Sequence, residues 1–314
     1  MSFNLSALST YTDQLSTDLV SAALLKPHSV QYLTVLPGKT AGTSAINLLN
    51  SSPYIIDATC GFGAAQVGPG GATGNSTAFS QIDLVVQSKM LKEQLCPEDL
   101  RTYWLSSQLS PSAYAESVPF EQQIATNKVN NIAQYVENTI WQGDGGSLSG
   151  LLAQGTVANG CIGGTGAGIT VPLAVGTAFD TIWNIYNKLT NALKQEEDLV
   201  MYMSMSNYAI AVQALMNEGN ALITQYPNIS NASGSAPMTF VWPGTNMTIF
   251  GAPGLNSNTH ILVGPKKYIY FGTGLLDDAD NFKFYYDPSQ DVVNFMSKFR
   301  MGTAIYASQF ASTI

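Results

Sequence analysis

The sequence predicts an α+β fold, because helical and strand patterns occupy different parts of its 314 residues. Amphipathic helical patterns lie between residues 97 and 219. From residue 238 onward, short apolar runs alternate with Pro, Gly and Asn-Asp turns, which is typical of β-strands. No internal repeat interrupts this order, and the length suits one large domain or two of ordinary size.

The N-terminal part of the chain predicts short elements followed by a long hairpin. Apolar residues indicate a short helix that ends at Pro27, then an extended segment at 29–36 and a Pro37-Gly38 turn. Residues 58–80 are rich in Gly and small polar residues and cannot form a core of their own. Because extended segments flank them, we predict a hairpin whose tip contains Gly63, Gly68, Gly70 and Gly74.

After a shorter helical pattern at 96–109, the segment 118–144 has the clearest helical pattern in the chain. Pro119 suits the first turn, Glu121 complements the helix dipole, and Gly143 suits the position after the last turn. An apolar stripe runs through Ile124, Val129, Ile132, Ala133, Val136 and Ile140. A helix of about 23 residues is about twice the average length, so we predict a rigid strut.

The remaining segments alternate between helix and strand and then become strands only. A Gly-rich stretch precedes a second amphipathic helix that runs from Phe179 to Leu193. The apolar residues 199–203 predict a buried strand, and Ser206 is expected to cap a third helix that Gly219 closes. Further strands are predicted at 238–242, 247–253, 260–264, 267–272, 282–286 and 292–310.

Composition limits the class of protein. Charged residues make up 11% of the chain, against roughly 25% in an average soluble domain. Neutral polar side chains, or further copies of the chain, must therefore cover its surface. A net charge of −8 with only 13 Lys and Arg argues against binding nucleic acid through its phosphates. No apolar run is long enough to span a bilayer, and the N-terminus lacks the features of a signal peptide.

No motif predicts a catalytic residue, a cofactor site or a metal site. His28 and His260 are not at ligand spacing from a cysteine or carboxylate. The glycines at 163–168 favour a flexible loop over a dinucleotide site, since no strand leads into them. The acidic run at 277–280 favours a solvated turn over a calcium site. The three widely spaced cysteines suit free thiols; they are Cys60, Cys96 and Cys161.

The segment that ends the long helix, ENTIWQGDGGSLSGL at 137–151, resembles a known family. It is similar to the end of the spine helix in HK97-fold major capsid proteins of tailed bacteriophages, and Gly143, Asp144 and Gly145 match the turn that follows it. A hairpin with a Gly-rich tip precedes this helix, as in the family. Three later motifs follow in the family's order, at 204–208, 249–254 and 299–304. Cys60 and the segment 95–100 further resemble capsid proteins of phages that infect Bacteroidetes, including the crAss-like group.

The resemblance implies a division of the chain and a function. The implied regions are an N-arm (1–56), an E-loop hairpin (57–86), a P-domain with the spine helix (87–144), an A-domain (145–265) and closing P-domain strands (266–314). The implied function is a non-enzymatic major capsid protein, whose hexamers and pentamers form an icosahedral shell around double-stranded phage DNA without sequence-specific contacts or a membrane. The implied partners are portal, scaffolding and decoration proteins, and the implied location is the virion, after assembly in the cytoplasm of the host bacterium.

Two other classes remain open. An encapsulin-type nanocompartment shares the fold and encloses cargo enzymes in place of DNA. A secreted β-rich binding module would account for the aromatic residues, but the absence of a signal peptide and the free cysteines speak against it.

Some members of the capsid family join an E-loop lysine to a neighbour's asparagine. This chain has no lysine between Lys39 and Lys89, so we expect a shell without such links.

Overall fold

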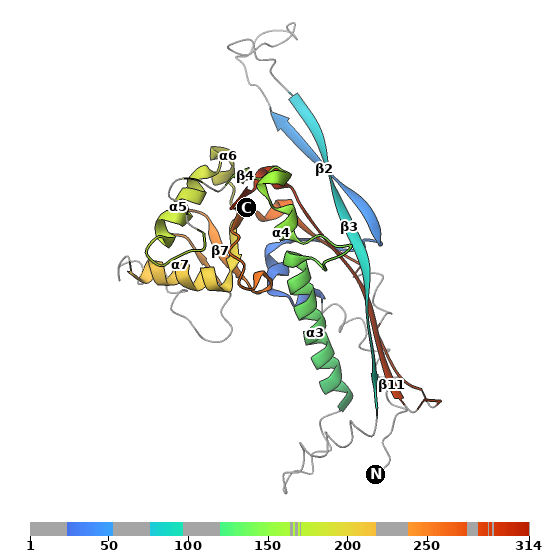
Figure 1. Ribbon diagram of the computed structural model, residues 1–314. Helices are drawn as coiled ribbons and strands as arrows, with labels where there is room; N and C mark the ends of the chain where they lie inside the picture. Colours follow the sequence, from blue (N-terminus) through green and yellow to red (C-terminus); the bar gives the residue numbers. More distant parts are fainter. Residues whose placement is uncertain are drawn as a thin grey trace.

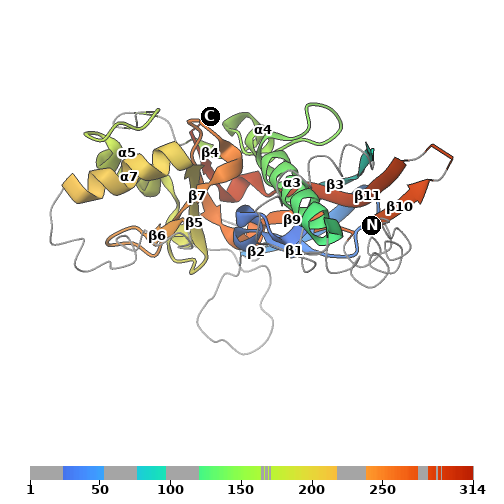
Figure 2. The same cartoon turned by 90° about the horizontal axis from the view of Figure 1, so that it is seen from below.

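The computed structural model describes residues 24–52, 76–96, 120–163, 166, 169, 171–217, 238–274, 282–287, 289–290 and 292–313. Within these ranges two six-stranded sheets form the framework (Figure 1). Helices pack against both sheets. Each sheet and its helices form one layer, and the two layers lie at opposite ends of the molecule when it is seen from below (Figure 2). The predicted α+β class is confirmed.

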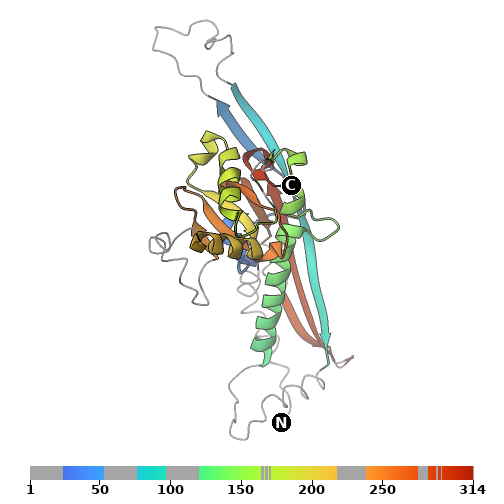
Figure 3. The same cartoon turned by 60° about the vertical axis from the view of Figure 1, so that its left-hand side comes forward.

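The first sheet is long and contains the hairpin. Its order is β1-β9-β11-β3-β2, with β10 also paired to β11. The strands are β1 (Thr34–Leu36), β2 (Gly42–Ser52), β3 (Ser76–Leu95), β9 (Ile269–Thr273), β10 (Phe282–Asp287) and β11 (Val292–Ile305). Strand β3 pairs with β2 along its first half and with β11 along its second half. The β2–β3 ribbon therefore projects beyond the body of the subunit (Figures 1 and 3).

The long helix α3 (Phe120–Gln142) covers one side of this sheet, and it has the predicted length. Its residues Ile132, Val136 and Ile140 are buried in one cluster with Phe295, Phe299 and Met301 of β11. Ile124 lies in the same helix, but its side chain is outside the described ones. The helix ends at Gln142, and Gly143 follows it with a positive φ of 77°.

The second sheet has the order β4-β12-β8-β5-β7-β6. Its strands are β4 (Ile162–Gly163), β5 (Leu199–Ser204), β6 (Thr239–Val241), β7 (Thr248–Ala252), β8 (Leu262–Pro265) and β12 (Ala311–Ser312). The helices α5 (Ala178–Lys188), α6 (Asn191–Lys194) and α7 (Met205–Asn217) belong to this part of the subunit, whereas α4 (Leu151–Gln154) packs against α3 and β11. The described residues also form short 3₁₀ turns: η1 (His28–Tyr32), η2 (Val157–Asn159), η4 (Pro253–Leu255), η5 (Lys266–Tyr268) and η7 (Ala307–Gln309).

Strand β5 lies between two cores, which explains its uninterrupted apolar sequence. Val200 and Tyr202 pack in the cluster around α3. Met201 and Met203 point the other way, into the cluster that α5 and α7 form. All six residues of β5 are buried, so the predicted buried strand is confirmed.

Several local predictions are wrong, one because of a long-range contact and two because a neighbouring residue caps the helix. The expected extended segment at 29–36 begins as the turn η1, since the backbone N–H and hydroxyl of Ser29 bond to Glu137. The helix expected from 179 to 193 is interrupted after α5, and the Thr190 hydroxyl accepts from the N–H of Leu193 to start α6. Helix α7 is capped by Ser204, not Ser206.

The ends of the chain contribute strands to both sheets. Strand β2 falls within the range 1–56 expected to be an N-arm, because its register with β3 runs from Gly42 opposite Val86 to Ser52 opposite Ser76. At the C-terminus, β12 leaves the first sheet and joins the second, between β4 and β8. The expected hairpin tip, the helix at 96–109 and the acidic run at 277–280 lie outside the described residues.

Candidate assembly surfaces

The turn after α3 holds the helix end against the hairpin strand. Oδ1 of Asp144 accepts from the backbone N–H groups of Gly146 and Leu148, both at 2.9 Å. Its other oxygen forms an ion pair with Lys89 of β3. A Cβ atom at Gly143 would lie 2.5 Å from the carbonyl oxygen of Leu148, so only glycine fits there. Gly145 has a positive φ of 71° as well.

Asp144 should therefore stabilise the subunit, and we predict the sign of its pH dependence. The hydrogen bond from Lys89 comes first among the causes that hold the Asp144 pKa well below its usual range, followed by the N–H groups of Leu148 and Gly146. A carboxylate with a lowered pKa stabilises the fold above its unfolded pKa, near 3.9, and this stabilisation is lost as the pH falls toward the folded value. Asp144→Ala should cost about 1–3 kcal/mol of unfolding free energy at pH 7, and less at pH 3.

Urea unfolding at both pH values measures this difference. The matched control is Glu196→Ala, which removes the exposed ion pair with Lys267 and should change stability by less than about 1 kcal/mol. Equal losses in the two variants, or an Asp144→Ala cost that does not shrink at pH 3, would contradict the assignment.

Glu137 is a buried carboxylate whose role in the fold the sequence did not single out. It is 6% exposed and accepts from the backbone N–H groups of Ser29, at 3.0 Å, and Gly254, at 3.3 Å. Trp141, one turn later, donates from Nε1 to the Ser29 hydroxyl at 2.7 Å. The end of α3 thus connects η1, which contacts the first sheet, to η4, which contacts the second sheet. The signal in the sequence was a carboxylate next to Val136 in the buried stripe.

The β2–β3 hairpin exposes apolar side chains. Leu49 and Phe79 lie directly opposite each other and are 64% and 81% exposed, the two highest values among the described large apolar residues. A two-stranded ribbon in water is marginal by itself, and an exposed pair of this kind indicates a contact surface. The predicted tip glycines, Gly63, Gly68, Gly70 and Gly74, lie outside the described residues.

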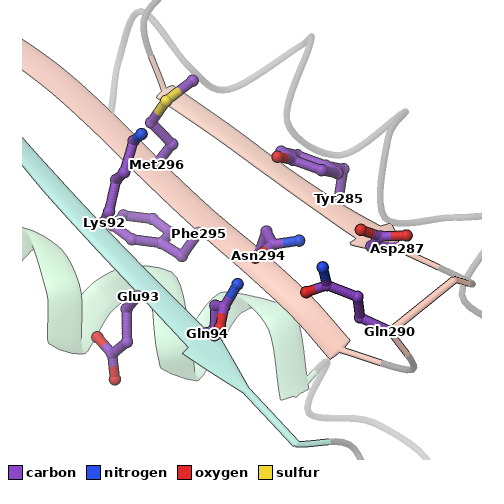
Figure 4. Close-up of a pocket in the computed structure, with 9 residues that line it drawn as sticks. All are labelled: Lys92, Glu93, Gln94, Tyr285, Asp287, Gln290, Asn294, Phe295 and Met296. Carbon is purple, nitrogen blue, oxygen red and sulfur yellow. The ribbon is translucent and has the colours of Figure 1, made fainter.

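A pocket of about 570 Å³ lies near the far end of the first sheet (Figure 4). Its lining is mostly amide, amine, hydroxyl and carboxylate groups, and comes from Lys92, Glu93, Gln94, Tyr285, Asp287, Gln290, Asn294, Phe295 and Met296. In Figure 4 Glu93 points toward the helix, whereas Lys92, Asn294 and Tyr285 point away from it. The pocket thus opens on the side of the sheet that α3 does not cover.

The side chains that could take part in catalysis or metal binding are not grouped in one site. His260 is buried, its Nε2 is 2.9 Å from the Ser312 hydroxyl, and burial lowers its pKa to about 4. Burial also raises the pKa of the Cys161 thiol to about 11. In the part of the chain that the structure describes, no three His, Cys, Asp or Glu side chains gather as a metal site would require. Likewise, none of the described helices is long and apolar enough to cross a membrane.

Solved structures with a similar fold come from phage capsids and related particles. The chain aligns with the capsid of a native GTA particle at a TM-score of 0.54 and 13% identity, over 93% of this chain and 89% of that one. The chain has a capsid fold. A chain of the satellite phage P4 procapsid, in a structure that includes the size determination (Sid) protein, gives a TM-score of 0.55 at 11% identity over 95% and 89% of the two chains. A chain of Mycobacterium phage Bobi gives 0.53 at 12% identity over 91% and 89%.

The capsid fold accounts for the long helix, the projecting hairpin and the two sheets. No protein-family model matches the chain, and no curated protein matches it in sequence. At these low identities the likeness is one of fold. The assembly itself is therefore inferred from the surfaces described above.

Proposed function

We propose that this chain is a major capsid protein that assembles with copies of itself into the icosahedral shell of a tailed bacteriophage and encloses double-stranded DNA. The observation that supports this most is a capsid fold over more than nine-tenths of the chain. The exposed pair on the projecting hairpin adds a surface that a monomer would leave in water.

Each part of the subunit has a physical role in such a shell. Helix α3 is a strut 23 residues long that holds the two sheets in a fixed relation through Glu137 and Trp141. The hairpin reaches beyond the subunit body. Only 11% of the residues are charged, so the chain can bury much of its surface against neighbouring subunits. Such burial costs little free energy because few charged groups lose their contact with water. A net charge of −8 also keeps packaged DNA from adhering to the coat.

The finer assignments belong to the same proposal. The region around the second sheet, near 145–265, would surround the capsomer axes, and the first sheet with α3 would meet neighbours at the threefold positions. Hexamers, pentamers, portal, scaffolding and decoration proteins would be its partners, with assembly in the host bacterial cytoplasm and a final place in the virion. Cys60 and the segment 95–100 support an origin among phages of Bacteroidetes. A structural role without catalysis agrees with these assignments.

Electron microscopy of the expressed protein tests the proposal. Closed particles of uniform size are expected, formed from the subunit alone or with scaffolding protein. A monomer that stays monodisperse at high concentration, with and without scaffolding protein, would overturn it. The encapsulin alternative differs in content, so particles from infected cells should contain nuclease-protected DNA; protected protein cargo without DNA would favour the alternative.

The shell should also be free of covalent links between subunits. Residues 40–88 contain no lysine, and Lys89 is engaged with Asp144 of its own chain. Particles boiled in SDS should give one band near 33.5 kDa. A ladder of multimers under reducing conditions would contradict the prediction.

A further inference from the structure

Three strands, β10, β11 and β3, form the pocket at the far end of the first sheet. The ladder aligns Tyr285 of β10 with Asn294 of β11, and Asn294 with Gln94 of β3. The next row contains Met296 of β11 and Lys92 of β3. Side chains two residues apart on a strand share one side of the sheet, so the two rows face the same way. In Figure 4 Lys92, Met296 and Tyr285 lie on one side of the ribbon.

The fold leaves the polar side chains of these rows unused. Within the described residues, no hydrogen bond or ion pair engages the side chains of Tyr285, Asn294, Gln94 and Lys92. On the other side of β3, by contrast, the charged side chains that face α3 form ion pairs. Tyr285 is also 49% exposed. The pocket therefore presents an aromatic ring, two amides and an amine that are available to a ligand.

A carboxylate at one end of the pocket is held in a fixed orientation. Oδ1 of Asp287 accepts from the backbone N–H of Ser289 at 2.9 Å and from the Ser289 hydroxyl at 2.6 Å. The bond from the hydroxyl comes first among the causes that keep the pKa of Asp287 below its ordinary value. Asp287 is therefore ionised at neutral pH and can accept hydrogen bonds from a ligand.

The lining disfavours several classes of ligand. A phosphate ligand would meet the Asp287 carboxylate, and in the described lining Lys92 is the only cation. An apolar ligand would need apolar walls, whereas most of this lining is polar. Glu93, the other acid of the lining, points toward the helix and pairs with Lys128, so it is not placed to share a metal ion with Asp287.

We propose that this pocket binds a neutral saccharide. The ring of Tyr285 stacks against the C–H face of a pyranose, since an aromatic side chain with a polar tip suits a ligand that is apolar on one face and wet at its edge. The amides of Asn294 and Gln94 supply both donors and acceptors, and Asp287 supplies an acceptor. Sugar hydroxyl groups both donate and accept, so they can pair with all three side chains.

The dimensions of the pocket suit one or two sugar rings. Three neighbouring strands span about 10 Å, and the rows from Lys92 to Asp287 span about 13 Å along the strands. The volume of about 570 Å³ lies within the range of small-molecule sites. The inference goes beyond the proposed function, because it gives the coat a surface that attaches to polysaccharide. In a shell, where every subunit repeats the site, many weak contacts act together.

Saturation-transfer NMR on the full-length protein tests the site. The probes are the methyl glycosides of glucose, galactose, mannose and N-acetylglucosamine, each added separately. Saturation transfer to the C–H protons of at least one probe is expected. Tyr285→Ala should lower the affinity at least about fivefold, and Tyr285→Phe should keep most of it because the ring remains. Tyr135→Ala is the matched control; Tyr135 is 41% exposed on α3, on the other side of the sheet, so binding should not change.

The outcomes decide between a saccharide site and its alternatives. No transfer to any probe at about 50 mM, which is above the millimolar range of a weak site, would overturn the inference. Equal transfer to the protein and to Tyr285→Ala would overturn it as well. Inorganic sulfate should not displace the bound glycoside; displacement would indicate an anion site around Lys92 and contradict the proposal. None of these results bears on assembly, so the capsid function would stand in each case.

Retention of particles gives a second readout, which rests on the proposed function. Particles should be retained on agarose that carries the best probe, and the free glycoside should elute them. Particles of Asn294→Leu, which removes one amide at similar volume, should pass through earlier. Unmodified particles that pass together with those of Tyr285→Ala would contradict attachment through this pocket. If no particles form at all, the proposed function fails, while the NMR result on the protein in solution still decides the saccharide site.

Discussion

Ile132→Asp should leave the subunit unable to fold. Ile132 is 4% exposed and belongs to the cluster that joins α3 to β11, beside Phe299. A carboxylate there would be buried without a cation, which costs several kcal/mol after the surroundings relax, and the packing of the isoleucine would be lost as well. A loss of this size takes up most of the roughly 5–15 kcal/mol that stabilises a domain.

The adjacent residue provides a control with the same chemical change. Asn131 is exposed on the same turn of α3, so Asn131→Asp adds an identical carboxylate in water. Circular dichroism and thermal melting should show a cooperative transition for Asn131→Asp and none for Ile132→Asp. A soluble Ile132→Asp subunit with an unchanged melting temperature would mean that this side of α3 faces solvent in the functional protein.

Deletion of Gly63–Gly74 should abolish shells while the subunit still folds. These residues are glycine and small neutral groups with no core of their own, so their order would have to come from a neighbouring subunit. The cores on both sheets are built from other residues, and they should survive the deletion. Sedimentation velocity should show free subunits or small oligomers in place of particles, with a melting temperature close to that of the full chain.

A second variant separates length from sequence at the hairpin tip. Replacement of the same residues by a Gly-Ser linker of equal length should restore some assembly if reach alone is required, and none if specific side chains such as Gln66 make the contact. Normal particles from the deletion itself would contradict an intermolecular role for the tip.

Hydrophobic periodicity and amino-acid composition were enough to predict the elements whose pattern is contained in their own segment of the sequence. The stripe from Ile124 to Ile140 and the closing Gly143 predicted a helix of about 23 residues, which is the length of α3, because a long helix with one apolar side has few alternatives. The Gly-rich segment between extended runs predicted a hairpin, and β2 and β3 pair accordingly. The sequence predicted the turn at Gly143–Gly145, but not its ion pair with Lys89, since 55 residues separate the two partners.

By itself, the sequence determined the fold class, the strut, the buried strand β5 and the low charge of the surface, because each depends on local period or on composition. Only the tertiary structure decided which of two sheets each strand joins, and so placed β12 in the second sheet. It also revealed Glu137, whose partners Ser29 and Gly254 lie more than a hundred residues away in either direction. The tertiary structure also decided which side of β3 is covered. The alternation of side chains along β3 is a local property, but the covered side depends on where α3 packs, which is a contact between segments far apart in the sequence.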